Sequence, residues 1–192
     1  MLAAGSSRRL GRPKQLLAID GRPLLQHAVD AAAAAGVGEV VVVLGAAMDE
    51  IVAAVELPAG ARVVANPDHA SGQASSLRAG LDALGADVGR AVVLLGDQPR
   101  VPVEAIRAVA AAPGPIARAA YRGSPGHPVA FDRRVWPELR AVTGDRGARD
   151  VMARHPGWVT AVALDAPAPG DVDTEEDYRR LLRNECPESD VR

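Results

Sequence analysis

The chain is poor in aromatic residues, has a single cysteine and contains no long apolar run. Aromatic residues make up 3% of its 192 residues, so the core must be built from Ala, Val and Leu. The lone Cys186 cannot form an internal disulfide, which indicates a reducing compartment and predicts a cytoplasmic location. No apolar run reaches the length of a membrane span, and the first residues lack the features of a signal peptide. We therefore expect no membrane partner.

An excess of charge of one sign is also missing. Lys and Arg number 22 against 24 Asp and Glu, a net charge of -2, which argues against nucleic acid as the main partner. The basic residues near the N-terminus are therefore expected to act as a local site. The length suits one domain with a sizeable core, which we place at residues 1–183, followed by a frayed tail at 184–192.

Strand and helix patterns alternate through the first half of the chain. Residues 39–44 and 90–95 each consist of one charged residue followed by a continuous apolar run, typical of parallel strands that are buried on both faces. A helical pattern begins at Pro23 and stops at Gly36. The alternation predicts an α/β fold with a largely parallel sheet. Further helices are expected over 48–55, 75–84 and 103–112, with a short strand at 62–64.

The pattern changes after residue 115. Two strands, 116–121 and 128–131, flank a polar, glycine-rich turn, which predicts a hairpin or β-arm over the site. The last helix is expected to begin after an N-cap at Asp173 or Thr174. The remaining expected elements are helices over 133–140, 146–155 and 175–182 and a strand over 158–164.

The chain is organised around its first fifteen residues. An apolar segment breaks at Gly5, where the backbone can turn and direct its N–H groups toward an anion. Arg9 and Lys14 add the positive charge that a polyphosphate needs. The loop fits neither the P-loop nor the dinucleotide fingerprint, and the alternative is a basic surface loop. We expect a nucleoside triphosphate at Leu2, Ala3, Ala4, Gly5, Ser6, Ser7, Arg9 and Lys14.

Two acidic segments are candidates for a metal site. Asp97 stands immediately beyond the buried run 90–95, at the sheet edge where open α/β folds bind ligands. Mg²⁺ prefers one or two carboxylates together with phosphate oxygens and water. The alternative for Asp97 is a turn-forming aspartate before Pro99. The second segment contains Asp171 and Asp173 and, taken alone, is an acidic helix start favoured by the helix dipole.

The motifs resemble those of the MobA-like nucleotidyltransferases, and most closely the molybdenum cofactor cytidylyltransferase branch. Residues 2–14 follow the signature L-A-A-G-x-S-x-R-x-G-x-P-K, and residues 96–99 match a metal-binding G-D-Q-P motif. Residues 171–178 resemble D-I-D-T-P-E-D-Y, which implies Asp173 as the second metal ligand and leaves Asp171 a lesser candidate. The resemblance implies a single-domain, Rossmann-like, three-layer α/β/α nucleotidyltransferase fold. Family members carry more apolar residues before the glycine, so either the first strand is short or Met1 is not the natural start.

Residues 72–80 resemble the base-reading segment of that branch. Glycine and small polar residues open a helix there, and helix-start amides and hydroxyls suit an anion, a base edge or a ribose. An ordinary serine N-cap is the alternative. The resemblance implies nucleotide contacts from Gly72, Ser75 and Ser76, with Asn66 just upstream.

Two later segments resemble elements on the acceptor side of the branch. Residues 126–129 are Gly-His-Pro-Val and residues 144–149 are Gly-Asp-Arg-Gly-Ala-Arg. The resemblance implies acceptor contacts from His127, Arg146 and Arg149. Taken alone, His127 is a histidine in a turn, and the second segment is a helix start with Asp145 as its N-cap.

The implied reaction is transfer of CMP from CTP to the phosphate of a molybdopterin-type cofactor, with release of pyrophosphate. Arg9, Lys14 and Asp97 are the implied catalytic residues, and Asp97 and Asp173 would hold Mg²⁺. A molybdoenzyme is a possible client. Two alternatives stay open: a sister enzyme that uses GTP or another acceptor, and a non-catalytic nucleotide- or cofactor-binding accessory protein for molybdoenzyme maturation.

Overall fold

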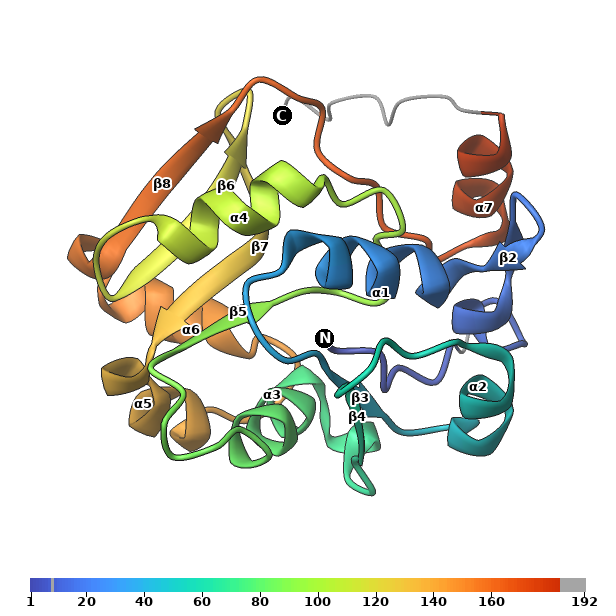
Figure 1. Cartoon of the computed structure of the whole chain (residues 1–192), viewed down its shortest axis with the longest axis horizontal. Coiled ribbons are helices and arrows are strands. Elements are labelled where there is room, and N and C mark those ends of the chain that lie inside the picture. Colours follow the sequence, from blue (N-terminus) through green and yellow to red (C-terminus); the bar gives the residue numbers. More distant parts are fainter. Residues whose placement is uncertain (8, 184–192) are drawn as a thin grey trace.

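The computed structural model describes residues 1–7 and 9–183 (Figure 1). The tail expected at 184–192 lies outside the described residues. Within them, no helix is long and apolar enough to cross a membrane. Strands and helices alternate as expected, and the described part of the chain is a mixed α/β fold.

The strands form one wide layer in which the N-terminal segment lies at the centre (Figure 1). Leu2 bridges in parallel to Val43 on one side and to Leu95 on the other. The Leu2 amide donates to the Leu94 carbonyl at 2.9 Å, and the Leu2 carbonyl accepts from the Gly96 amide at 2.9 Å. The segment before Gly5 therefore pairs as a short strand with both neighbours. On its two sides lie the parallel pair β3 (Val41–Leu44) and β4 (Arg62–Ala65) and the four-stranded sheet β5 (Arg90–Val93), β7 (Ser124–Asp132), β6 (Ile116–Tyr121) and β8 (Val159–Leu164), in that order.

The predicted hairpin is present, but its strands lie inside the sheet and not as an arm over the site. β6 and β7 pair antiparallel through a turn at Arg122 and Gly123, which is shorter than the turn expected at 122–126. β7 pairs antiparallel with β5 on its other side, and β6 pairs in parallel with β8. Because β7 is inserted between β5 and β6, the sheet is parallel in its first half and mixed in its second.

Helices cover both faces of the sheet and make three layers (Figure 1). Side chains of α4 pack on Ala117 and Ala119, while those of α3, α5 and α6 pack on Ile116 and Phe131, which point to the other face. The left-handed Gly36 ends α1 where the sequence predicted a stop. The helices are α1 (Leu24–Ala35), α2 (Met48–Ala54), α3 (Gln73–Asp82), α4 (Val103–Ala111), α5 (Trp136–Ala141), α6 (Ala148–Arg154) and α7 (Glu175–Leu182), and the hairpin β1 (Ala18–Ile19) and β2 (Arg22–Pro23) precedes α1.

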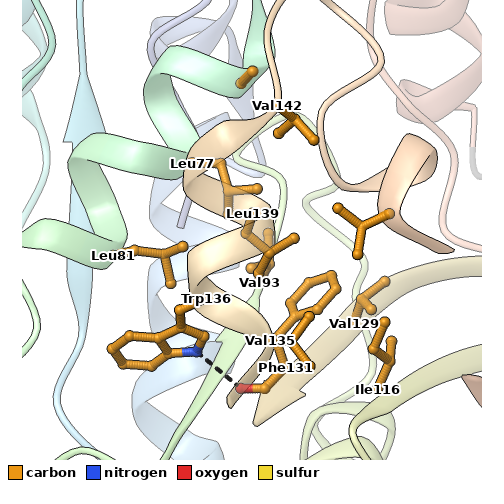
Figure 2. Packing of buried hydrophobic residues seen from close by; sticks show 12 residues of the cluster. Leu77, Leu81, Val93, Ile116, Val129, Phe131, Val135, Trp136, Leu139 and Val142 are labelled. Atoms are coloured by element: carbon orange, nitrogen blue, oxygen red, sulfur yellow. Dashed lines mark hydrogen bonds between the residues drawn. The ribbon is translucent and has the colours of Figure 1, made fainter. Parts of the chain in front are cut away.

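The few aromatic residues are concentrated in the core, although most of the core is built from small aliphatic residues. Trp136, Phe131 and Tyr121 are the largest fully buried side chains. Trp136 packs in the cluster beneath α3 and α5 (Figure 2), and its indole N–H donates to the Phe131 carbonyl at 3.3 Å. A buried Trp needs such an acceptor. This half of the sheet is consequently the rigid support for one wall of the candidate site.

A cavity of about 590 Å³ lies at the amino ends of β3 and β5. Its walls are largely apolar and include Val41, Leu81 and Ala91. It is at the opposite end of these strands from Asp97, and of the predicted nucleotide- and metal-binding residues only Leu2 lines it. The predicted chemistry is therefore concentrated at the carboxyl ends of the strands.

Candidate active site

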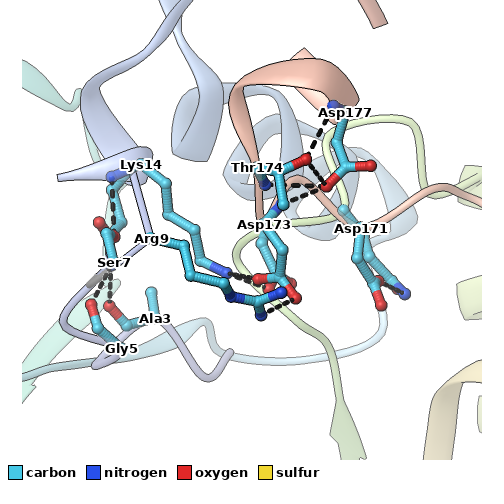
Figure 3. Close-up of polar contacts among 12 residues, drawn as sticks. Ala3, Gly5, Ser7, Arg9, Lys14, Asp171, Asp173, Thr174 and Asp177 are labelled. Atoms are coloured by element: carbon cyan, nitrogen blue, oxygen red, sulfur yellow. Dashed lines mark hydrogen bonds and ion pairs between the residues drawn. The ribbon is translucent and has the colours of Figure 1, made fainter. Parts of the chain in front are cut away.

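The N-terminal loop is held in shape by the side chains of Ser7, within its motif, and of Gln15, directly after it. Ser7 has a positive φ of 50°, and its hydroxyl accepts a hydrogen bond from the Lys14 amide at 2.9 Å. The Gln15 amide nitrogen donates to the Ala3 carbonyl at 2.7 Å and to the Gly5 carbonyl at 3.2 Å (Figure 3). Gln15 is 2% exposed. The sequence analysis missed Gln15, which stands directly after the last residue of the motif, Lys14.

Lys14 joins the loop to both acidic segments. Its ammonium lies 2.6 Å from a carboxylate oxygen of Asp97 and 2.8 Å from one of Asp173. Figure 3 shows Lys14 and Arg9 both directed at Asp173. Burial lowers the pKa of Lys14, but the two carboxylates outweigh it, so that the net shift is upward. Lys14 is therefore fully charged at neutral pH. Residues that are 83 and 159 positions apart from it in the chain meet at this one ammonium.

Asp97 is positioned by the close packing of the strand end that precedes it. A Cβ atom on Gly96 would lie 2.7 Å from the Ala3 Cβ and 3.0 Å from a Leu25 methyl group, so only glycine fits here. The Asp97 carbonyl accepts from the Val172 amide at 3.1 Å, which ties the two acidic segments together. The other carboxylate oxygen of Asp97, Oδ1, is buried and has no hydrogen-bond partner among the described residues.

The two aspartates of the second acidic segment have different environments. Asp173 accepts hydrogen bonds from Lys14 and from Arg9, the latter at 2.8 Å, and the hydrogen bond from Lys14 is the main cause of its lowered pKa. Asp171 accepts from the Gln98 amide at 2.6 Å instead. Burial and then the charge of Asp97 raise the pKa of Asp171, against the opposing hydrogen bond from Gln98. The geometry thus places Asp173, and not Asp171, beside Lys14.

The start of α7 fixes Asp173 in place. Thr174 is the N-cap, and its hydroxyl accepts from the Asp177 amide at 3.1 Å. The Asp177 carboxylate in turn accepts from the amide of Thr174 at 2.8 Å and from that of Asp173 at 3.2 Å. This capping box satisfies the free amides of the helix start. Of the two predicted N-caps, the structure selects Thr174.

A cavity of about 330 Å³, which we call the nucleotide cavity, opens between the N-terminal loop and the start of α3. Ligand pockets of proteins typically measure about 300–1,000 Å³. Of the predicted residues, Ser7, Arg9 and Asp173 do not line this cavity. Its walls also include Gln73, His69 and Asp145, which the sequence analysis did not select. The predicted residues that do line it are Leu2, Ala3, Ala4, Gly5, Ser6, Lys14, Gly72, Ser76 and Asp97. Gly72 has a φ of 110°, and a Cβ there would lie 2.4 Å from the Gly144 carbonyl carbon.

Asn66 and Ser75 are close to this cavity but do not line it. The Asn66 amide nitrogen donates to the hydroxyl of Ser75 at 2.9 Å and to that of Ser76 at 3.0 Å. Asn66 is buried, at 4% exposure. The structure therefore brings these three predicted residues together, with only Ser76 facing the cavity.

The three predicted acceptor residues do not form one group. His127 and Arg149 line a second, smaller pocket, whereas Arg146 lies on the surface, where it is ion-paired with Asp150. Arg118 of β6 lines the same pocket and was missed by the sequence analysis. The available signal was a single arginine within an otherwise apolar strand, Ile-Ala-Arg-Ala-Ala-Tyr.

The donor set suits a hard divalent cation that also binds substrate. Asp97 and Asp173 supply carboxylate oxygens on either side of one point, and Asp97 Oδ1 is buried without a partner among the described residues. In the described part of the chain, there is no group of three or more His, Cys, Asp and Glu side chains that could hold a metal ion by itself. Two carboxylates leave coordination positions for phosphate oxygens and water, which is the arrangement that Mg²⁺ favours.

The family model of the MobA-like NTP transferase domain matches residues 1–160. The chain belongs to this family. A relative in Paenarthrobacter nicotinovorans, named nicotine blue oxidoreductase, is 39% identical and covers 95% of this chain and 94% of its own length. Membership of a nucleotidyltransferase family indicates an enzyme with a nucleotide substrate.

Two solved structures extend the comparison. The Rv0371c protein of Mycobacterium tuberculosis in complex with manganese superposes with a TM-score of 0.81 at 36% identity, covering 95% of both chains. A nucleotidyl transferase from Methanothermobacter gives a TM-score of 0.80 at 25% identity, covering 95% of this chain and 94% of that one. The predicted fold class is confirmed, and the manganese complex is consistent with use of a divalent metal ion.

Proposed function

We propose that this chain is a Mg²⁺-dependent nucleotidyltransferase that transfers CMP from CTP to the phosphate of molybdenum cofactor and releases pyrophosphate. The observation that carries the proposal is the meeting of Lys14, Asp97 and Asp173 at the mouth of a phosphate-binding loop. A protein that only binds a nucleotide does not need two carboxylates at that point. The single cysteine of the chain suits a reducing compartment, which favours a cytoplasmic enzyme. The product of the reaction would pass to a molybdoenzyme client.

Lys14 and the loop amides are the groups that hold the triphosphate in this proposal. Gly5 and Ser6 line the nucleotide cavity together with Lys14. Arg9 is exposed and at present pairs with Asp173, so its guanidinium can turn to a bound phosphate at little cost, since exposed ion pairs contribute about 0–1 kcal/mol. Positive groups around the α-phosphate stabilise the charge that develops there during transfer.

Asp97 and Asp173 are the proposed ligands of Mg²⁺. When bound, the ion supplies Lewis-acid neutralisation of phosphate oxygens. The two carboxylates compensate the charge of Lys14 when no ligand is present. Gly96 and the α7 capping box keep the two carboxylates in place, which avoids reorganisation during the reaction.

The acceptor needs positioning more than activation. A phosphate acceptor is already an anion at neutral pH, so no strong general base is required, and the gain comes from orientation beside the α-phosphorus. Gln73 and Asp145 also line the nucleotide cavity. They belong to the start of α3 and to the segment before α6, and both can contact the base, the ribose or the acceptor.

Three alternatives to the proposal can be distinguished from it. A sister enzyme would prefer GTP or another acceptor, since the loop residues do not choose a base. An accessory protein would bind nucleotide without metal-dependent turnover. The name of the Paenarthrobacter relative would correspond to a redox reaction, but the chain lacks the Gly-x-Gly-x-x-Gly fingerprint of a dinucleotide site.

The test is pyrophosphate release with Mg²⁺ and CTP, GTP, ATP or UTP, with and without molybdenum cofactor. The test variant is Asp97→Asn, and the matched control is Asp165→Asn, an exposed carboxylate that pairs with Arg122. We expect CTP- and cofactor-dependent release that falls at least 100-fold in Asp97→Asn and is unchanged in the control. Pyrophosphate release that shows no preference for CTP over the other nucleotides would contradict the proposal. An Asp97→Asn variant that remains active would contradict it as well.

A further inference from the structure

Two buried glutamines, Gln15 and Gln26, differ in how their amide groups are satisfied. Gln26 is 3% exposed, and its amide donates to the Glu56 carbonyl at 2.9 Å and accepts from the Glu56 N–H at 2.7 Å. Gln15 also donates, but its oxygen Oε1 is buried and has no hydrogen-bond partner among the described residues. A buried acceptor without a partner is costly, and an apolar side chain would avoid that cost. The N–H groups of Gln15 therefore have a role that an apolar residue could not fill.

The amide nitrogen of Gln15 binds two carbonyl groups of the N-terminal loop. It lies 2.7 Å from the Ala3 carbonyl oxygen and 3.2 Å from the Gly5 carbonyl oxygen (Figure 3). Carbonyl oxygens only accept hydrogen bonds, so the nitrogen of the amide, and not its oxygen, must face them. Ala3 and Gly5 both line the nucleotide cavity. Their carbonyl groups are thus held by the protein and cannot turn toward an anion in the cavity without losing a donor.

The backbone N–H groups of the same loop are not held in this way. Within residues 1–7 and 9–183, the N–H groups of Gly5, Ser6 and Ser7 donate to no protein group. Gly5 and Ser6 are exposed and line the nucleotide cavity. Successive N–H groups that have no internal partner form an anion-binding concavity. With its carbonyls held by Gln15 and its N–H groups free, the loop offers donors to the cavity.

Gln15 belongs to a short turn that contacts the loop at three points. The turn is a 3-10 helix, Lys14–Leu16. The Lys14 N–H donates to the Ser7 hydroxyl at 2.9 Å, and Gln15 supplies the contacts to Ala3 and Gly5. The Lys14 ammonium is directed at carboxylates instead. Gln15 has no charge to offer to a ligand, so any effect on an anion must come through the orientation of the loop.

We propose that Gln15 is a positioning residue for the triphosphate, because it holds the Ala3 and Gly5 carbonyls so that the loop presents N–H groups to the phosphates. This inference rests on the proposed function for the identity of the nucleotide, but the binding of a triphosphate can be measured without it. Gln15 itself does not contact the reacting atoms. The loop binds the phosphates both before and during transfer, so the loss of Gln15 should raise the KM for the nucleotide more than it lowers kcat.

The first test is the affinity of the full chain for inorganic triphosphate with Mg²⁺, measured by titration calorimetry. Gln15→Met keeps the length of the side chain and removes the amide. It should weaken triphosphate binding by about tenfold or more, the usual effect of losing a hydrogen bond to a charged group. Gln26→Met is the matched control, since Gln26 is equally buried and does not line the nucleotide cavity. It should bind triphosphate like the unchanged chain, although it too loses stability.

A second variant makes the same contact depend on pH. In Gln15→Glu, a carboxylate would face two carbonyl oxygens and repel them, whereas a protonated carboxyl group can donate to one of them. Triphosphate affinity, relative to the unchanged chain at the same pH, should therefore recover as the pH is lowered from about 8 to about 5.5, since burial raises the pKa of a carboxyl group. Gln15→Met has no group that titrates there, so its relative affinity should stay constant. Thermal melting confirms that each variant is folded, and Gln15→Glu retains the test if Gln15→Met unfolds.

The inference is overturned if the unchanged chain does not bind inorganic triphosphate, or if Gln15→Met binds it as tightly as the unchanged chain. Equal losses in Gln15→Met and Gln26→Met would also overturn it, because the effect would then follow stability alone. So would a loss in Gln15→Glu that is the same at both pH values. Weakened triphosphate binding in Gln15→Met, without pyrophosphate release from any nucleotide, would instead contradict the proposed function and support the role of Gln15.

Discussion

The nucleotide cavity and the smaller pocket lined by Arg118, His127 and Arg149, which we call the arginine pocket, share Leu2 and Gln73 but differ in how charge is compensated. In the first, one lysine contacts two carboxylates, and each group has an opposite charge within 2.8 Å. In the second, two arginines face a neutral histidine with no described carboxylate in the wall. The charge of Lys14 is therefore compensated when the first site is empty, whereas no described carboxylate lining the second pocket compensates its arginines.

This difference indicates how the nucleotide cavity gains its ligands. A ligand must compete there with existing ion pairs, so that Lys14 and the carboxylates exchange partners when triphosphate and metal enter. We therefore expect binding in this cavity to depend on metal and nucleotide together.

The largest expected effect comes from removing Lys14, the cation that Asp97 and Asp173 share. Lys14→Ala should lower the rate of pyrophosphate release by about 10²–10³-fold, the usual effect of losing one preorganised group that stabilises transition-state charge. It also leaves Asp97 and Asp173 without their common partner. Arg12→Ala is the control, since Arg12 lies in the same loop but pairs with Glu175. Steady-state kinetics of both variants measure the effect, and equal losses would contradict the role of Lys14.

The electrostatics of the arginine pocket should affect the pH dependence of stability through His127. The pKa of His127 is about 4 in the folded chain against 6.5 for an ordinary histidine, so the unfolded chain binds more protons between these values. Stability is thus complete above about pH 6.5 and falls toward pH 4, by up to about 3 kcal/mol for this group. His127→Gln should remove that part of the loss. Urea unfolding at several pH values measures it, and parallel profiles for the two proteins would be evidence against the pocket electrostatics.

The packing that positions Asp97 gives the next effect. Gly96→Ala would place a methyl group 2.7 Å from the Ala3 Cβ, and we expect a destabilisation of about 1–3 kcal/mol together with reduced activity, because the strand end must shift. Gly89→Ala is the control, since a Cβ at Gly89 meets no atom within 4 Å and its φ is not positive. Thermal unfolding distinguishes them. Equal stability of the two variants would show that the close approach at Gly96 does not constrain the site.

The smallest expected effect concerns the cap that holds Asp173. Thr174→Ala removes one half of the capping box and should cost about 1 kcal/mol of stability. Activity should fall only a few-fold, because Lys14 and Arg9 still bind the Asp173 carboxylate. Thr143→Ala, at an exposed loop position, is the control. A Thr174→Ala enzyme with activity as low as that of Lys14→Ala would show that the cap, and not the ion pairs, positions Asp173.

The fold and the residues of the group formed by Lys14, Asp97 and Asp173 could largely be predicted from the sequence. Buried strands appear as continuous apolar runs, and the helix over 175–182 has its bounds where they were expected. Lys14, Asp97 and Asp173 were selected because each stands in a local motif at the end of a strand or the start of a helix. Their meeting follows from the parallel strands, whose carboxyl ends share one edge.

The order of the strands and the positions of several site residues could not be predicted, because they depend on contacts between segments that are far apart in the sequence. The insertion of β7 between β5 and β6 is decided by strand pairing and not by the hairpin itself. Arg118 looked like an isolated charge in an apolar strand until the ladder placed it opposite Val129. Arg146 was chosen from its motif, but the turn before α6 directs it to Asp150 at the surface. Asn66 was expected at the ligand and is satisfied by two serines.

The measurement that tests the central claim most directly is a double-mutant cycle of Asp97→Asn and Asp173→Asn on metal-dependent pyrophosphate release. If the two carboxylates act as one unit around the position of Lys14, the double variant should be no more than a few-fold worse than the worse single variant. If their effects multiply, or if Asp173→Asn retains full activity, the two carboxylates act separately, and the convergence at Lys14 is not the basis of the activity.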